Sequence, residues 1–170
     1  PEKIIDKKQE KKIINKSIKP TFFALKKKKI YYTGFLYVGL MIQDNEPYLI
    51  EFNVRMGDPE CQVILPRLKT DLIKIINNVV NNKLDRTIIN WHKKKSMTVV
   101  LCSKGYPGKY KKNKIIKNLD KIKLSKNDFI YHAGTKLEND QLKSNGGRVL
   151  NITSVGTDFF KIRKKIIAII

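Results

Sequence analysis

The sequence predicts an α+β fold, in which an antiparallel sheet packs with helices and a smaller β-rich domain follows. One reason is a pair of apolar-rich segments, 35–42 and 48–54, separated by a short polar turn, which is typical of a β-hairpin. A second is the helical spacing of apolar residues in segments 4–18 and 71–81. The third is the later part of the chain, where short β-type segments alternate with turns. With 170 residues, of which 41% are hydrophobic, the chain can bury a core.

The first helix is predicted over residues 4–18, where isoleucines form one apolar stripe among lysine and glutamate residues. Pro20 is expected to end it, because an interior proline removes a backbone hydrogen bond. A lysine-rich loop at 26–29 then leads to a strand over 31–42, rich in aromatic and β-branched side chains. After a polar turn, the strand at 48–54 is expected to return antiparallel to it.

Two helices are predicted after this hairpin. The segment Cys61–Leu65 is expected to form a short helical turn before Pro66. Thr70 is the expected N-cap of a longer helix over 71–81, whose apolar residues fall on one face.

The composition changes at residues 81–85, and we place there the boundary between two predicted domains, residues 1–82 and 83–170. The second domain is predicted to be β-rich. It ends in an amphipathic helix over 158–170 that stops without a capping signal. Its predicted strands are residues 97–102, 129–133, 135–137 and 148–155, and its predicted turns are residues 105–108 and 145–147.

The net charge of +21 raises the question of nucleic-acid binding. Only five of the 36 basic residues are arginine, the usual reader of bases and phosphates, and the lysines are spread along the whole chain. We therefore expect no nucleic-acid partner. A basic nucleic-acid-binding module without catalysis remains the alternative to an enzyme.

Composition also bears on the compartment. No apolar run approaches the roughly 20 residues of a membrane span, and no signal peptide is apparent. The two cysteines, Cys61 and Cys102, form neither a zinc motif nor a disulfide framework. We expect a cytoplasmic protein without a membrane partner. Because the sequence begins with Pro1 rather than Met, we expect it to be an excised or incomplete chain.

The most informative segment begins at Glu51 and combines a strand pattern with a row of polar groups. Glu51, Asn53 and Arg55 alternate with apolar residues, so in a strand they would share one face. Carboxylate and amide oxygens are ligands for Mg²⁺, and arginine binds phosphate. Asp58 and Glu60 follow, with carboxylates suited to hold Arg55 or a substrate amine. The other interpretation is an edge strand whose polar side chains face water.

Six segments of the chain, in collinear order, carry a family resemblance. They are Tyr32–Ile42, Ile50–Gln62, Leu68–Leu72, Gly105–Gly108, His132–Lys136 and Asn145–Leu150. Together they resemble the phosphoribosylamine–glycine ligase family, also called glycinamide ribonucleotide synthetases, of the ATP-grasp superfamily. The resemblance covers nearly the whole chain and implies the second half of an ATP-grasp fold followed by the β-rich domain, which lacks the family's segment after the last helix.

The resemblance implies roles for particular residues. Glu51 and Asn53 fall on the family's Mg²⁺ or Mn²⁺ ligands, Arg55 on its catalytic phosphate-side arginine, and Met41 near the adenine of ATP. Many members of the superfamily carry another acidic metal ligand where this chain has Gly39. Asp58, Glu60 and Arg148 are expected to bind substrate. The other interpretation of Arg148 is that it forms an ion pair within the protein. His132 either lines the cleft or has a structural role.

The implied reaction is the ATP-dependent ligation of glycine to 5-phosphoribosylamine through glycyl phosphate, with ATP as co-substrate, in purine biosynthesis. The family's N-terminal domain and its central phosphate-gripping lid do not match any residues of this chain. The expected partner is therefore the missing N-terminal part of the same enzyme, and we expect the fragment alone to be inactive.

Overall fold

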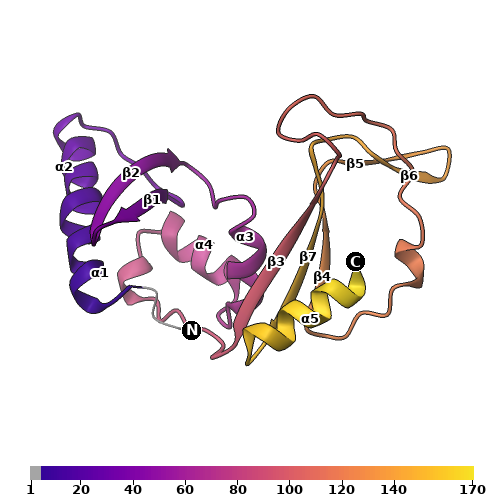
Figure 1. The fold of residues 1–170 in the computed structure, drawn as a ribbon. Coiled ribbons are helices and arrows are strands. Elements are labelled where there is room, and N and C mark those ends of the chain that lie inside the picture. The colour runs from indigo at the N-terminus through magenta and orange to yellow at the C-terminus, as the bar shows by residue number, and fades with distance from the viewer. Residues whose placement is uncertain (1–4) are drawn as a thin grey trace. The chain divides into compact units, whose positions relative to one another are not determined.

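Figure 1 shows the fold in the computed structural model, which describes residues 5–170. The chain forms two compact units. The first contains the described residues up to Gly57 together with Thr70–Ile89, and the second contains Asp58–Lys69 together with Asn90–Ile170. The chain thus passes between the units three times. The predicted division into residues 1–82 and 83–170 stays a prediction, whereas the predicted α+β fold with antiparallel sheets is confirmed.

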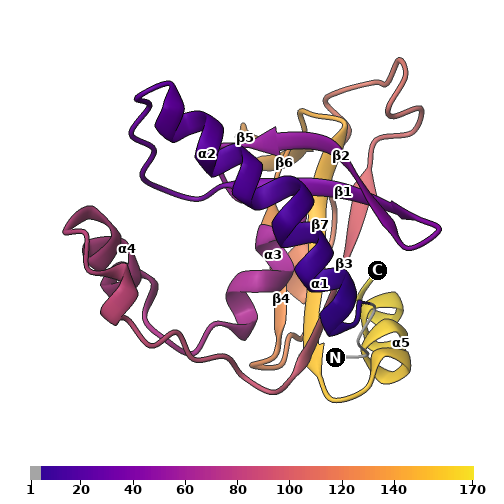
Figure 2. The same cartoon turned by 90° about the vertical axis from the view of Figure 1, so that its left-hand side faces the viewer.

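The first unit begins with α1 (Lys7–Ile13), a π-helical turn (Ile14–Ile18) and α2 (Lys19–Lys27), which follow one another as a continuous rod in Figure 2. The carboxylate of Asp6 caps α1 by accepting a hydrogen bond from the backbone N–H of Gln9 at 2.7 Å. The prediction that Pro20 ends the helix is wrong. Pro20 lies in the first turn of α2, and the wider π-helical turn before it accommodates the residue that lacks an N–H. Ile4, in the predicted apolar stripe, lies outside the described residues.

The hairpin of β1 (Tyr37–Gln43) and β2 (Glu46–Asn53) forms a two-stranded antiparallel sheet, as the sequence predicted. Asp44 and Asn45 connect the strands with φ values of 50° and 62°, the left-handed conformation that two-residue hairpin turns favour. The strand predicted to start at residue 31 begins only at Tyr37.

Ion pairs attach the hairpin to the helical rod. Glu46 pairs with Lys12 and with Lys16, the latter at 2.6 Å between Nζ and Oε2. Hydrogen bonds from these two ammonium groups lower the pKa of the Glu46 carboxyl. Lys12 also donates to the backbone oxygen of Asn45 at 3.0 Å, so the turn and the helix are joined at more than one atom.

The remaining helices of this region differ slightly from the predicted ones. The longer helix, α4 (Leu72–Val80), is capped by Asp71 rather than by Thr70, because the Asp71 carboxylate accepts the N–H of Lys74 at 2.8 Å. Thr70 instead donates its hydroxyl to the backbone oxygen of Ile88 at 3.4 Å.

Among residues 5–170, no helix combines the length and apolar character that crossing a membrane requires. The shorter helical segments are α3 (Cys61–Ile64), η2 (Leu65–Arg67), η3 (Leu84–Arg86) and η4 (Leu119–Lys121).

The core of the second unit lies between a three-stranded antiparallel sheet and one helix. The strands are β3 (Lys95–Cys102), β7 (Arg148–Gly156) and β4 (Asp128–His132), in that spatial order. α5 (Phe159–Ile169) packs on one face through Ile162 and Ile166, which contact Ile152 of the central strand.

A smaller hairpin of β5 (Thr135–Glu138) and β6 (Gln141–Ser144) precedes β7. The sequence predicted β5 but not β6, because Gln-Leu-Lys-Ser has no β-branched or aromatic residue. Its turn uses Asn139 and Asp140 in left-handed conformations. The predicted turn at 145–147 joins β6 to β7.

A polar network centred on Asp128 ties β4 to the rest of this unit. Asp128 is buried and accepts hydrogen bonds from Ser154 of β7 at 2.7 Å and from Ser125 at 2.7 Å. Lys165 of α5 completes it with an ion pair of 2.8 Å. Burial alone would raise the pKa of this carboxyl, but the bonds from Lys165, Ser125 and Ser154 outweigh it and lower the pKa from 3.8 to about 2.

We expect Asp128→Asn to lower the free energy of unfolding by about 2 kcal/mol at neutral pH, since each pKa unit corresponds to 1.36 kcal/mol. The folded-state pKa is depressed, so this stability is present above pH 3.8 and is lost as the pH falls toward 2. Denaturant unfolding at pH 7 and at acid pH measures the difference, which should shrink at low pH. Asp140→Asn, at an exposed turn, is the matched control and should change little. A pH-independent difference would contradict the assignment.

Candidate active site

The strongest pair of predicted site residues lies at the end of β2. Asn53 donates from its amide nitrogen to the Glu51 carboxylate at 2.9 Å, so the two side chains lie on the same face, as strand periodicity predicts. Glu51 is exposed and Asn53 is half-buried. Gly39 is the register partner of Glu51 on β1, and a Cβ at this glycine would lie 3.0 Å from Cγ of Glu51. The glycine thus leaves room for the carboxylate.

The donor set of this pair fits a divalent cation that takes its other oxygen ligands from phosphates and water. The Glu51 carboxylate supplies oxygens, and rotation of the Asn53 amide supplies a neutral one. Among residues 5–170, no group of three or more histidine, cysteine, aspartate or glutamate side chains is arranged to hold a metal ion.

Arg55 and Met41 belong to the same unit. β2 ends at Asn53, so Arg55 lies just beyond the strand; it is exposed, and its Nη1 donates to the backbone oxygen of Met56 at 2.9 Å. Met41 lies on β1 opposite Tyr48 and is 56% exposed. Both side chains are accessible to a ligand, and their roles stay predictions.

Arg148 joins three parts of the second unit. Its Nη1 donates to the backbone oxygen of Asp58 at 2.6 Å and lies 3.1 Å from the Asp58 carboxylate, and its Nε donates to the hydroxyl of Tyr106 at 3.1 Å. The hydrogen bond with Tyr106 is the main reason that the pKa of Arg148 is raised. Asp58 also accepts from the amide of Gln62 at 3.2 Å, and half-buried Glu60 directly precedes α3. The structure therefore brings Asp58 and Arg148 together.

The sequence does not predict the contacts of Tyr106. The segment Gly105–Gly108 and the pair Gly146–Gly147 each have the pattern of a local turn, and neither pattern indicates that the two segments meet. In the structure the Tyr106 ring covers Gly147 so closely that a Cβ there would lie 2.0 Å from a ring carbon. Gly147 is thus required for contact with the residue that orients Arg148. For His132, the sequence leaves both a cleft role and a structural role open. In the structure its Nδ1 lies 3.0 Å from the Thr135 hydroxyl, a local contact at the end of β4.

Comparisons with known proteins give two matching family models and a similar solved structure. The family model described as "Phosphoribosylglycinamide synthetase, ATP-grasp (A) domain" matches residues 1–61, and "Phosphoribosylglycinamide synthetase, C domain" matches residues 96–170. The crystal structure of phosphoribosylamine–glycine ligase from Thermotoga maritima is similar over 98% of the chain, with a TM-score of 0.78 and 29% sequence identity.

Curated relatives from a bacterium and from a vertebrate are also similar to this chain. The phosphoribosylamine–glycine ligase of Caldanaerobacter subterraneus is 43% identical over 164 residues, covering 96% of this chain and 39% of the relative. The trifunctional purine biosynthetic protein adenosine-3 of Gallus gallus is 43% identical over 148 residues, covering 86% of this chain and 15% of the relative. The chain thus spans about two fifths of the length of the Caldanaerobacter and Thermotoga proteins, the latter with 40% covered.

The matched family model and the matched fold define the class as ATP-grasp ligases. Within this class, the chain belongs to the phosphoribosylglycinamide synthetase family. The predicted resemblance is confirmed.

Proposed function

We propose that this chain supplies the metal-binding hairpin and the C domain of a ligase that joins glycine to 5-phosphoribosylamine at the expense of ATP. The observation that carries the proposal is the contact between Glu51 and Asn53 on one face of β2, inside the residues matched by the ATP-grasp family model. The relatives' names supply the reaction, since curated relatives that are 43% and 42% identical to this chain are phosphoribosylamine–glycine ligases.

In the proposed chemistry, a glycine carboxylate oxygen attacks the γ-phosphorus of ATP, and ADP leaves as glycyl phosphate forms. The amine of 5-phosphoribosylamine then attacks the acyl carbon, phosphate leaves, and the amine loses a proton as the amide forms. Glu51 and Asn53 would hold Mg²⁺ or Mn²⁺, which neutralises phosphate charge when bound. Arg55 would stabilise the transferring phosphoryl group, and Met41 would contact the adenine. Every step uses substrate nucleophiles, so no protein nucleophile is required.

Asp58, Glu60 and Arg148 are proposed to bind the substrates. The guanidinium of Arg148 uses Nη1 and Nε for its contacts with Asp58 and Tyr106, and among the described residues its Nη2 makes no hydrogen bond. One edge of the guanidinium therefore remains for an anionic substrate group. The Asp58 carboxylate, which is already beside this arginine, would accept from a substrate amine on its outer side.

The rest of the same enzyme is the proposed partner of this chain. An isolated two-stranded hairpin is marginally stable in water, and β2 leaves a run of apolar side chains exposed. These are Tyr48, Leu49, Ile50 and Phe52, at 56%, 47%, 63% and 40% exposure. Burial of this surface by further polypeptide agrees with the 39% of the Caldanaerobacter ligase that the chain covers. We propose the cytoplasm as its location, with domains of residues 1–82 and 83–170.

Growth without purines tests the proposal. In a bacterial strain that lacks its own ligase, we would express this chain alone and a chimera in which it replaces the matched segment of the Caldanaerobacter enzyme. The chimera should restore growth, whereas the chain alone should not, because it has only part of the site. A chimera that is folded and well expressed but supports no growth would overturn the proposed reaction.

A further inference from the structure

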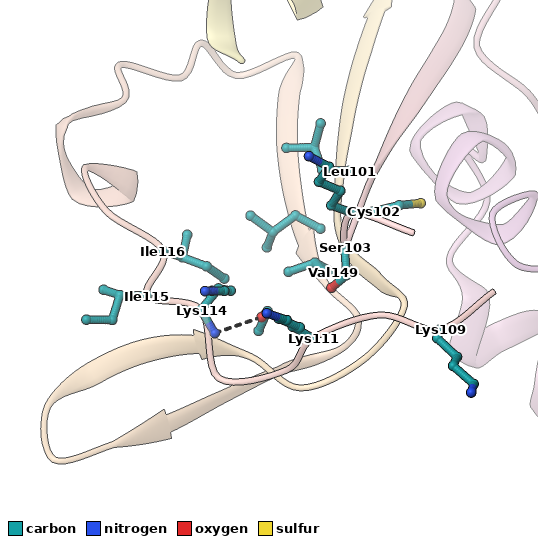
Figure 3. A pocket seen from close by; sticks show the side chains of 12 residues that line it. Leu101, Cys102, Ser103, Lys109, Lys111, Lys114, Ile115, Ile116 and Val149 are labelled. Carbon is teal, nitrogen blue, oxygen red and sulfur yellow. Dashed lines mark hydrogen bonds between the residues drawn. The ribbon is translucent and has the colours of Figure 1, made fainter. Parts of the chain in front are cut away.

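A cavity of about 710 Å³ opens in the second unit, and Figure 3 shows the side chains that line it. One wall comes from the ends of β3 and β7. The other comes from residues 109–116, which pair with β6 through backbone hydrogen bonds such as that from Ile116 to Leu142 at 2.8 Å. The volume falls within the range of small-molecule sites, about 300–1,000 Å³. None of the seven predicted site residues lines this cavity, so its binding chemistry does not depend on the proposed ligase function.

The inner surface of the cavity is mainly apolar. Val149 and Leu150 of β7 are buried there, and Leu101 of β3 is half-buried beside them. Ile115 and Ile116 lie across the opening from Leu101 and Val149 in Figure 3. A ligand with an apolar body would remove this surface from water, which is favourable in proportion to the area covered.

The rim of the cavity is positively charged. The lining contains four lysines and neither an aspartate nor a glutamate. Among the ion pairs between described residues, none includes any of these four lysines, so protein carboxylates do not neutralise them. A cavity with one sign of charge and low-dielectric walls concentrates the field on an anion. The four are Lys104, Lys109, Lys111 and Lys114.

A buried hydroxyl adds a polar group inside the cavity. Ser144 is only 4% exposed and lines the cavity from the end of β6. Its oxygen accepts the backbone N–H of Lys114 at 3.1 Å, the dashed line in Figure 3, so its own proton is oriented to donate elsewhere. Binding sites of small molecules commonly combine apolar walls with a few such groups.

We propose that this cavity binds a small amphipathic anion, with a phosphate or carboxylate at the lysine rim and an apolar body between Ile116 and Val149. An inorganic anion would leave the apolar walls in water, and a neutral apolar molecule would leave the lysine charges unused. The two parts of the ligand therefore contribute together.

The test is calorimetric titration of the 170-residue chain with 1-naphthyl phosphate, which joins an aromatic body to a phosphate. We expect one site, with binding at least about tenfold tighter than for inorganic phosphate or 1-naphthol, a difference of 1.4 kcal/mol. Amide NMR shifts should change in Leu101 and in residues 109–116. Binding no tighter than that of inorganic phosphate, or shifts confined to other segments, would overturn the proposal.

A matched pair of double variants separates this site from general attraction to a basic protein. Lys111→Ala with Lys114→Ala should weaken binding of 1-naphthyl phosphate about tenfold. Lys161→Ala with Lys164→Ala removes the same charge from the exposed face of α5 in the same unit and should leave binding unchanged. If both pairs weaken binding of 1-naphthyl phosphate equally, net charge alone attracts the probe. This result would contradict a specific binding site in the cavity.

Discussion

Replacing Glu51 by alanine in the Caldanaerobacter chimera should lower kcat for glycine ligation at least about a hundredfold, with the fold intact. The size follows from losses seen when one group that stabilises transition-state charge is removed, roughly 10²–10³. Glu51 is exposed and its only side-chain hydrogen bond among the described residues comes from Asn53, so truncation removes little packing. Steady-state turnover and circular dichroism together measure the two effects.

The matched control lies on the same strand. Glu46 is the other carboxylate of β2, but it pairs with Lys12 and Lys16 of the helical rod instead of facing Asn53. Glu46→Ala should leave kcat within about threefold, because it removes only these ion pairs, which are solvent-exposed and contribute little. Mn²⁺ provides a second measurement: its paramagnetic broadening of Asn53 amide signals in the isolated chain should disappear in Glu51→Ala. Near-normal turnover in Glu51→Ala would contradict the metal assignment.

The common face of Glu51 and Asn53 could be predicted because it depends only on the two-residue period of a strand, which local sequence records. The same holds for the hairpin turn at Asp44 and Asn45, whose residue types favour positive φ. Such features need no knowledge of distant residues. They are the parts of the fold and of the candidate site that the residue pattern determines directly.

Other features depend on contacts between distant residues. Tyr106 is 42 positions from Arg148, and no local pattern links a turn tyrosine to that arginine. The cap of α4 could not be assigned either, because Thr70 and Asp71 are both good capping residues. In the structure Asp71 accepts the N–H of Lys74, whereas Thr70 donates to the distant Ile88. Segment 58–69 belongs to the second unit, where α3 and η2 contact β3. The amino-acid composition of the segment does not indicate this contact.

Arg148→Ala in the chimera should lower kcat/KM for 5-phosphoribosylamine about ten- to a hundredfold, because hydrogen bonds to charged groups contribute roughly 1.5–3 kcal/mol. The competing interpretation is that Arg148 only anchors the loop at Asp58. Asp58→Asn separates the two, since it removes the ion pair of 3.1 Å but keeps the backbone oxygen to which Arg148 donates at 2.6 Å. If Arg148 binds the substrate anion, Asp58→Asn should lower kcat/KM less than Arg148→Ala does. The Asn amide oxygen can still accept from the substrate amine, and the partly exposed ion pair that is lost is worth no more than about 1 kcal/mol.

Tyr106→Phe is the control for orientation, because it removes the hydroxyl 3.1 Å from Nε of Arg148 and keeps the ring over Gly147. In Tyr106→Phe, Arg148 keeps its charge but loses the bond that aligns its guanidinium. If Arg148 binds the substrate, KM for 5-phosphoribosylamine should therefore rise while kcat changes little. The double variant Arg148→Ala/Asp58→Asn decides the question. Residues that act solely through each other show the same loss in kcat/KM in both single variants and no further loss in the double variant. This result would show that Arg148 acts only on the loop at Asp58.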